Sequence, residues 1–169
     1  PVNGTAPTYE LRYMRLVDIP QIVLIDQESF SMPWSASSYA RELKESDYSH
    51  MVVLERTLSY PPLNPLHGVW RWLAGRKQLD HKVMAYGGLW LFGDEAHIST
   101  IATHPAHRGK GWGELTLLAM LRRALTLSAR SVVLEVRVSN KRAQALYEKY
   151  GFHTRGIKQG YYYDNQEDA

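Results

Sequence analysis

The segment His107-Arg108-Gly109-Lys110-Gly111-Trp112-Gly113 lies between a predicted strand, Ile98–Thr103, and a predicted helix that begins near Gly113. The first backbone N–H groups of a helix have no partner within the helix, and the helix dipole adds partial positive charge there. Glycine lets a ligand approach the backbone closely, and Arg108 and Lys110 add positive charge. The segment is therefore either a simple tight turn or a binding site for a phosphate-rich cofactor.

Two well-known phosphate-binding motifs do not fit this segment. The dinucleotide motif G-x-G-x-x-G needs a third glycine where this chain has Glu114. Its ribose-binding acid belongs at a strand tip, whereas the acidic residue at that distance, Glu135, falls inside a predicted strand. The P-loop motif G-x-x-x-x-G-K is absent from the sequence. The sequence therefore disfavours a dinucleotide fold and excludes a P-loop.

Before this segment, the sequence predicts two helices and a run of strands. The first helix begins at Asp18-Ile19-Pro20 and the second is capped by Ser35, each with apolar residues spaced three or four apart. Alternating or apolar runs predict strands at Tyr9–Tyr13, Met51–Leu54, Val83–Tyr86 and Leu89–Phe92, followed by Ile98–Thr103.

After this segment, helices and strands alternate. The helix near Gly113 is predicted to present one apolar face, formed by Leu115, Leu118, Leu121 and Leu125. A strand is predicted at Ser131–Val138, followed by a helix that Ser139-Asn140 caps and Gly151 ends. A final strand is predicted from Phe152.

The composition is that of one folded domain without cysteine chemistry. The 169 residues are 44% apolar and 22% charged, and none is Cys. The absence of Cys excludes disulfides, thiolate zinc sites and an acyl-cysteine intermediate. With no H-E-x-x-H motif we expect no catalytic metal, and the lack of G-x-S-x-G disfavours a serine hydrolase.

The distribution of charge and of apolar residues limits which partners and which cellular location we expect. The segment Tyr60–Lys82 holds four basic residues and one acidic residue, which account for the whole net charge of +3. A broad basic face is therefore absent, and we expect no direct nucleic-acid binding. No apolar run is long enough to span a membrane, and Pro1–Thr8 lacks the features of a signal peptide. The expected location is cytoplasmic.

An insertion at about 60–80 separates two predicted strands. It contains Pro61, Pro62, Pro65 and two Trp residues, and it exceeds a normal hairpin loop of about two to five residues. We expect a short helix there, with apolar residues Leu66, Val69, Trp70 and Leu73. The Trp pair either packs this insertion onto the domain or forms a contact surface for a ribosome, membrane or partner protein.

Two residues in the C-terminal half have either a structural or a chemical role. Glu135 lies in a valine-rich strand, where a buried unpaired carboxylate is costly. It either faces water beside Arg137 or takes part in chemistry. Tyr147 either packs in the core through the apolar stripe of its helix or acts in a site.

Two longer patterns resemble those of one enzyme family. Arg108-x-x-Gly111-x-Gly113 is similar to the acetyl-CoA signature of the GCN5-related N-acetyltransferases (GNAT). A more specific resemblance, to the members of this family that acetylate protein amino termini, is carried by Leu134-Glu135-Val136-Arg137-x-Ser139-Asn140-x-x-Ala143-x-x-Leu146-Tyr147-x-x-x-Gly151-Phe152. Pro33-Trp34-Ser35, Tyr161-Tyr162 and Glu167-Asp168-Ala169 resemble the branch that acetylates protein amino termini, including the bacterial ribosomal-protein-alanine acetyltransferases. Gly160 departs from this branch, which tends to carry Asn before the tyrosine pair.

The resemblance implies an α/β (α+β) fold with a mixed, mostly antiparallel sheet, a splayed parallel strand pair and flanking helices. It implies one N-acetyltransferase domain over 1–169, interrupted at about 60–80, with the family's last strand expected after 169. Acetyl-CoA would be the cosubstrate.

The resemblance also assigns roles to individual residues. Glu135 would be the general base and Tyr147 the general acid. The residues that would bind acetyl-CoA are Ile101, Ala102, Thr103, Arg108, Gly109, Lys110, Gly111, Trp112, Gly113, Glu114 and Asn140. The first residues of the acceptor would meet Met32, Pro33, Trp34, Tyr161 and Tyr162.

The chemistry of acetyl transfer fits these residue types. An α-amine has a pKa of about 8 and must lose a proton before it attacks a thioester. A carboxylate with a pKa of about 4.3 is a weak base, so Glu135 would act through an ordered water or with its pKa raised by the neighbouring valines. A tyrosine with a pKa of about 10 can protonate a leaving thiolate with a pKa of about 8.5.

The resemblance therefore predicts acetyl-CoA-dependent acetylation of a protein N-terminal α-amine, with a ribosomal protein as one possible acceptor. Two alternatives remain open: a related transferase acting on lysine or a small amine, and a non-catalytic CoA-binding or ribosome-associated module.

Overall fold

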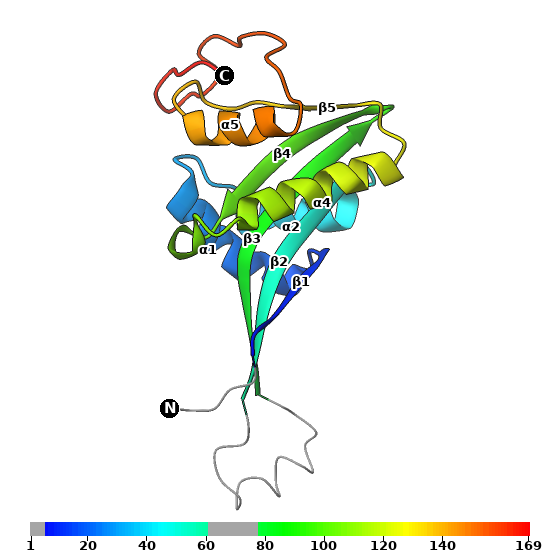
Figure 1. The fold of residues 1–169 in the computed structure, drawn as a ribbon, viewed down its shortest axis with the longest axis vertical. Coiled ribbons are helices and arrows are strands. Elements are labelled where there is room, and N and C mark those ends of the chain that lie inside the picture. Colours follow the sequence, from blue (N-terminus) through cyan, green and yellow to red (C-terminus); the bar gives the residue numbers. More distant parts are fainter. Residues whose placement is uncertain (1–5, 61–77) are drawn as a thin grey trace, which may run out of the picture.

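A computed structural model describes residues 6–60 and 78–169. In these residues one five-stranded sheet, ordered β1-β2-β3-β4-β5, has α4 on one face and α1 and α2 on the other, with α5 beyond β5 (Figure 1). The elements, with η marking 3-10 turns, are β1 (Thr8–Tyr13), η1 (Leu16–Asp18), α1 (Ile19–Ser29), α2 (Ala36–Glu45), β2 (Ser49–Tyr60), β3 (Gln78–Phe92), β4 (Glu95–Thr103), η2 (Pro105–His107), α4 (Trp112–Thr126), β5 (Ser131–Leu134) and α5 (Lys141–Lys149).

The sheet is mixed, and its parallel pair separates. Strands β1 to β4 pair antiparallel, whereas β4 and β5 pair parallel from Glu95↔Ser131 to Ile98↔Leu134. Beyond that point β4 continues to Thr103 while residues 135–138 leave it. This arrangement confirms the predicted mixed sheet with a splayed parallel pair. The predicted strand Ser131–Val138 is too long, because its second half no longer pairs with β4.

Strand β3 is continuous where two segments, Val83–Tyr86 and Leu89–Phe92, were predicted. It passes through Gly87-Gly88, and its register with β4 shifts between Gly88 and Leu89. A Cβ atom on Gly88 would meet the Met51 sulfur, so the Met51 side chain packs directly against the backbone at this glycine. The helix expected within the insertion lies outside the described residues.

The spacing of apolar residues predicts only some of the helix residues that are buried. Ile22 and Ile25 of α1 and Tyr39 of α2 are fully buried, and the Ser35 hydroxyl caps α2 by accepting from the Ser38 amide at 3.0 Å. In α4 the predicted apolar face is largely wrong, because Leu121 packs against the core but Leu115, Leu118 and Leu125 are 40%, 38% and 74% exposed. The side of α4 that packs on the sheet consists of Thr116, Leu117, Met120 and Ala124.

The segment after α5 is a loop. The strand predicted from Phe152 is not formed, and the backbone of the segment pairs largely within itself, as between Lys158 and Ala169 at 2.9 and 3.1 Å. The loop also contacts the splayed segment, since the Val138 amide donates to the Asp168 carbonyl at 3.2 Å. In the part of the chain that the structure describes, no helix is long and apolar enough to cross a bilayer.

Candidate active site at the splayed strands

The glycine-rich segment opens α4 at the end of β4. Gly111 is the N-cap of α4 with φ of 81°, and Gly109 has φ of 80°, which is a left-handed conformation that favours glycine. A Cβ atom on Gly113 would lie 3.0 Å from the Thr103 hydroxyl, so the helix start packs closely against the strand end. The unpaired amides of the first turn of α4 therefore lie beside the end of β4, where an anion could bind.

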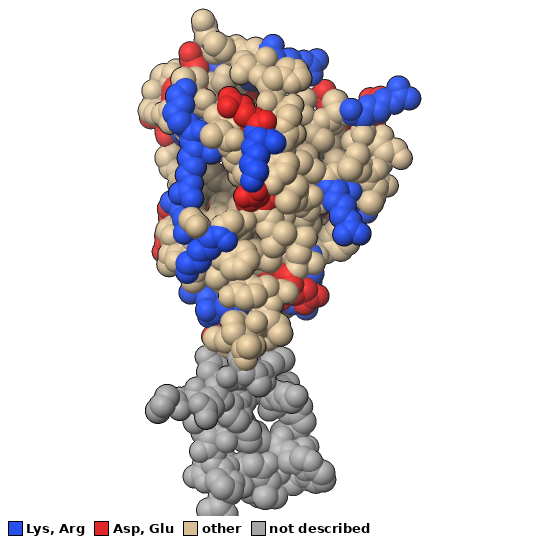
Figure 2. Space-filling view, viewed as in Figure 1, with Lys and Arg blue, Asp and Glu red and all other residues tan. Residues whose placement is uncertain are grey.

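A pocket of about 620 Å³ lies at this junction. In Figure 2 it is seen as a hollow beneath α5, bordered by Lys and Arg side chains. The predicted residues that line it are Ile101, Ala102, Thr103, Arg108, Gly109, Gly111, Trp112, Gly113, Glu114, Asn140 and Tyr147. Lys110 is not among the lining residues. The sequence analysis missed Ser29, Phe30, Arg142, Ala143 and Leu146, which also line it.

The two arginines of the pocket have different surroundings. Arg108 donates from Nε to the Thr103 carbonyl at 3.1 Å and from Nη2 to the Ser29 hydroxyl at 2.9 Å. These hydrogen bonds connect the glycine-rich loop to β4 and to the end of α1. Arg142 lies on the first turn of α5 and reaches to within 3.9 Å of a Cβ atom built on Gly109. Arg142 is therefore a second cation at the glycine-rich loop.

Asn140 and Glu114 bind protein groups at the pocket wall. The Asn140 side-chain oxygen caps α5 by accepting from the Ala143 amide at 3.1 Å, as its predicted capping role requires. Glu114 accepts from Lys149 at 2.5 Å and from the Tyr150 hydroxyl, and these contacts lower its pKa. Asn140 thus caps α5 within its own first turn, whereas Glu114 links α4 to the end of α5.

Glu135 lies where the parallel strands separate. Its carboxylate accepts from His97 Nε2 at 2.6 Å on one oxygen and from Lys158 Nζ on the other. Burial raises the pKa of Glu135, but the contacts with Lys158 and His97 outweigh burial, and the net shift is downward. Of the two routes considered for Glu135, an ordered water or a raised pKa, the lowered pKa favours the ordered water, and the carboxylate is ionised at neutral pH. Arg137 pairs with Asp164 at 2.8 Å and with Glu167 at 3.1 Å rather than with Glu135.

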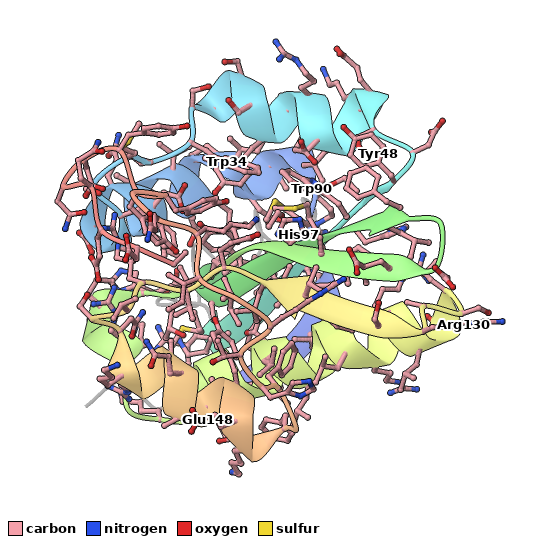
Figure 3. The ribbon with its side chains drawn as sticks, turned by 90° about the horizontal axis from the view of Figure 1, so that it is seen from above. Trp34, Tyr48, Trp90, His97, Arg130 and Glu148 are labelled. Atoms are coloured by element: carbon pink, nitrogen blue, oxygen red, sulfur yellow. The ribbon has the colours of Figure 1, made fainter. Side chains whose placement is uncertain are left out.

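His97 contacts the candidate base Glu135, and the sequence analysis did not identify it. It lies on β4, and its ring meets the edge of Trp90 at 5.8 Å between centroids. Figure 3 shows Trp34, Trp90 and His97 between α2 and the sheet. The alternation of β4 could have indicated this position, because the neighbours Ala96 and Ile98 are buried on the face of α4 while His97 points to the other face. A histidine there can share a proton with Glu135.

The predicted acceptor-binding residues come from two loops that touch each other. Ser31 in the α1–α2 loop donates to Asp164 at 2.5 Å, which links this loop to the segment that carries Tyr161 and Tyr162. Arg137 lies over the Tyr162 ring at 3.9 Å from its centroid. The structure thus places Met32, Pro33 and Trp34 on a loop joined to the tyrosine pair.

Tyr147 lines the pocket from α5. Burial, with a smaller effect from Tyr162, raises its pKa to about 12. Burial also raises the pKa of Tyr162, which Arg137 lowers and Tyr161 and Glu135 raise to smaller extents. The phenol of Tyr147 is a weaker acid than the ordinary tyrosine that the sequence analysis assumed.

A buried carboxylate positions Trp34. Asp26 Oδ2 accepts from the Trp34 amide at 3.1 Å and from the Tyr39 hydroxyl at 2.7 Å. Its Oδ1 has no hydrogen-bond partner among the described residues. Burial raises the pKa of Asp26 in spite of these two hydrogen bonds. An ionised Asp26 therefore costs stability that a protonated Asp26 does not.

We predict that the stability of the wild type relative to Asp26→Asn falls as the pH rises. With a raised folded pKa, the stability contribution of Asp26 is present below its unfolded pKa of about 3.9 and is lost as the pH rises through the folded pKa. The slope cannot exceed about 1.4 kcal/mol per pH unit for one group. Urea unfolding of both proteins from pH 4 to 8 measures the difference, in which other titrating groups largely cancel. A difference that stays flat or grows with pH would contradict the prediction.

Comparisons with known proteins give the following matches. The model described as the acetyltransferase (GNAT) family matches residues 19–152. A Bacillus subtilis protein named as a candidate ribosomal protein bS18-alanine N-acetyltransferase is 36% identical over 159 residues, which cover 94% of this chain and 90% of its own.

Solved structures share the fold. The ribosomal-protein-S18-alanine N-acetyltransferase from Escherichia coli superposes with a TM-score of 0.72 at 24% identity, covering 95% of this chain and 89% of its own. A chain of the NatC complex bound to Gag peptide and CoA gives a TM-score of 0.68 at 16% identity, covering 95% and 93%. The predicted fold is thereby confirmed.

Proposed function

Since this chain belongs to the acetyltransferase (GNAT) family and is an acyltransferase, as its motifs predicted, we propose that it transfers an acetyl group from acetyl-CoA to the N-terminal α-amine of a protein. The observation that carries the proposal is the opening between β4 and residues 135–138. The pocket with Tyr147 lies at this opening, and Glu135 with His97 and the two acceptor loops adjoins it. An acyl donor and an amine could meet there from different sides.

The pocket residues fit the chemistry of coenzyme A. The free amides at the start of α4, beside the left-handed Gly109 and Gly111, would hold the pyrophosphate, with Arg142 as a further cation. Strand residues Ile101 to Thr103 have no ladder partner on the β5 side and would hold the pantetheine arm. Bound in this way, acetyl-CoA supplies an activated acetyl thioester.

Glu135 and His97 would take the proton that the acceptor must lose. The α-ammonium of an acceptor has a pKa of about 8, so a base is needed at neutral pH. The depressed pKa of Glu135 supports proton removal through a water or through His97 rather than by the carboxylate alone. The neutral amine nitrogen then forms a bond to the acetyl carbon, the carbon–sulfur bond breaks, and Tyr147 supplies a proton to the sulfur. The nitrogen loses its second proton as the amide forms, and this proton restores the Tyr147 phenol through solvent.

The acceptor class follows from the two loops and from the relatives. Trp34 stacks on Trp90 at 6.1 Å, and Tyr161 and Tyr162 form a T-shaped pair at 5.1 Å, so aromatic side chains border the base on both loops. The Bacillus subtilis relative is named for the alanine of ribosomal protein bS18. We therefore propose a ribosomal protein beginning with alanine as the acceptor.

We expect the protein to acetylate a synthetic peptide that carries the first residues of bS18 with a free N-terminal alanine. The peptide is incubated with acetyl-CoA, and fragment mass spectra locate the added acetyl group. A matched peptide with a blocked N-terminus and one lysine serves as control and should stay unmodified. Acetylation of that lysine at an equal rate would favour a lysine acetyltransferase, and acetylation of neither peptide would contradict the proposal.

A further inference from the structure

Lys158 places an ammonium group on the candidate base. It lies in the loop after α5, and its Nζ donates to Glu135 Oε1 and lies 5.2 Å from the centroid of the Tyr161 ring. The Lys158 side chain is 59% exposed, whereas that of Glu135 is only 15% exposed. An exposed and flexible side chain thus reaches back to a half-buried carboxylate.

The surroundings of this ammonium suit any primary ammonium. A carboxylate forms a charge-assisted hydrogen bond, and the face of an aromatic ring attracts a cation. A protein amino terminus enters the site as the same chemical group, because its pKa of about 8 leaves most of it protonated at neutral pH.

We propose that Glu135 and Tyr161 form a subsite for the α-ammonium of the acceptor, and that Lys158 occupies this subsite until the acceptor displaces it. The inference rests on the proposed function and adds to it how the acceptor amine is held before it loses its proton. It also makes Lys158 a competitor of the substrate within the same chain.

The remaining contacts of Glu135 allow this exchange. His97 holds Oε2 at 2.6 Å, so the carboxylate keeps its orientation when Lys158 leaves Oε1. Ion pairs of exposed lysines contribute little to stability, so displacing Lys158 from Glu135 requires little free energy. Arg137, the nearest arginine in sequence, is paired with Asp164 and Glu167 and therefore does not compete with Lys158 for Glu135.

The variant Lys158→Met removes the competing charge and keeps much of the length of the side chain. We expect its KM for the free-amine bS18 peptide to fall about three- to fivefold, as expected for loss of a weak ion pair and of charge repulsion. Arg155→Met is a matched control, because Arg155 lies in the same loop as Lys158 and pairs with the exposed carboxylate of Glu95 at 3.2 Å, away from Glu135. Its KM for the peptide should stay unchanged.

A binding measurement separates the ammonium subsite from other effects of the substitution. With CoA present, the Kd of the free-amine peptide should fall in Lys158→Met by a similar factor. The Kd of a desamino peptide, which lacks the α-amine, should be equal in both proteins. A Lys158→Met variant with an unchanged or higher KM, or one that tightens both peptides equally, would overturn the inference. Because the wild type must first acetylate the N-terminal peptide, failure of the proposed function is seen separately.

Discussion

Glu135→Gln is expected to lower kcat for N-terminal acetylation by about 100-fold or more, within the usual range for removal of a general base. Glutamine keeps the shape of the side chain and can still contact His97, but it cannot hold a proton taken from the acceptor. Acetyl-CoA affinity should change less than about twofold, because Glu135 is not among the residues that line the pocket. Steady-state kinetics with the free-amine peptide and calorimetric titration of CoA measure the two effects.

The control for this substitution is Glu95→Gln on β4. Glu95 forms an exposed ion pair with Arg155 at 3.2 Å and lies at the opposite end of β4 from Thr103. The Glu95→Gln variant should therefore have the same kcat and the same CoA affinity as the wild type. Full activity of Glu135→Gln, or equal losses in both variants, would remove Glu135 from the catalytic role.

The positions that carry a strong local signal could be predicted from the sequence. Gly111 at the start of α4 has the left-handed φ that glycine favours, Asn140 caps α5 with its side chain, and the structure bears out both helix starts. Ser35 caps α2 for the same reason. These residues satisfy backbone groups of their own helix, so the few residues around them suffice for the prediction.

Features set by distant partners could not be predicted in this way. Helix α4 carries leucines on more than one side, so its spacing does not reveal which side meets the sheet, and Thr116 is buried while Leu115 is exposed. The end of β5 at Leu134 depends on where β4 diverges, which no local pattern encodes. The pKa of Glu135 is lowered by His97 and Lys158, which are 38 and 23 residues away in sequence.

The splayed strands explain why one sheet can serve two substrates. Ala96 and Ile98 belong to the core beneath α4, together with Tyr147, whereas Trp34, Tyr39 and Tyr86 belong to the core beneath α1 and α2. A continuous β4–β5 ladder would separate these two sides. Because pairing stops at Leu134, Glu135 and the pocket residues of β4 lie at an opening between them.

Tyr147→Phe is expected to lower kcat by about 10- to 100-fold, again with CoA affinity largely retained, because loss of a general acid slows departure of the thiolate. The raised pKa of about 12 has a consequence for the pH profile. The phenol stays protonated through the alkaline range in which the enzyme can be assayed, so loss of the Tyr147 proton should cause no fall in kcat up to about pH 10. Rates for the wild type and Tyr147→Phe from pH 6 to 10 measure both effects.

A second tyrosine on the same helix end makes this test specific. The Tyr150 hydroxyl donates to Glu114, so Tyr150→Phe removes a hydroxyl from the same helix end without removing the proposed acid. If Tyr147 supplies the proton, Tyr150→Phe should keep kcat within about twofold while Tyr147→Phe loses at least tenfold. Equal kcat values for Tyr147→Phe and the wild type would show that the thiolate leaves unaided. Such a result is chemically reasonable for a leaving group with a pKa of about 8.5, and it would confine proton transfer to the side of Glu135 and His97.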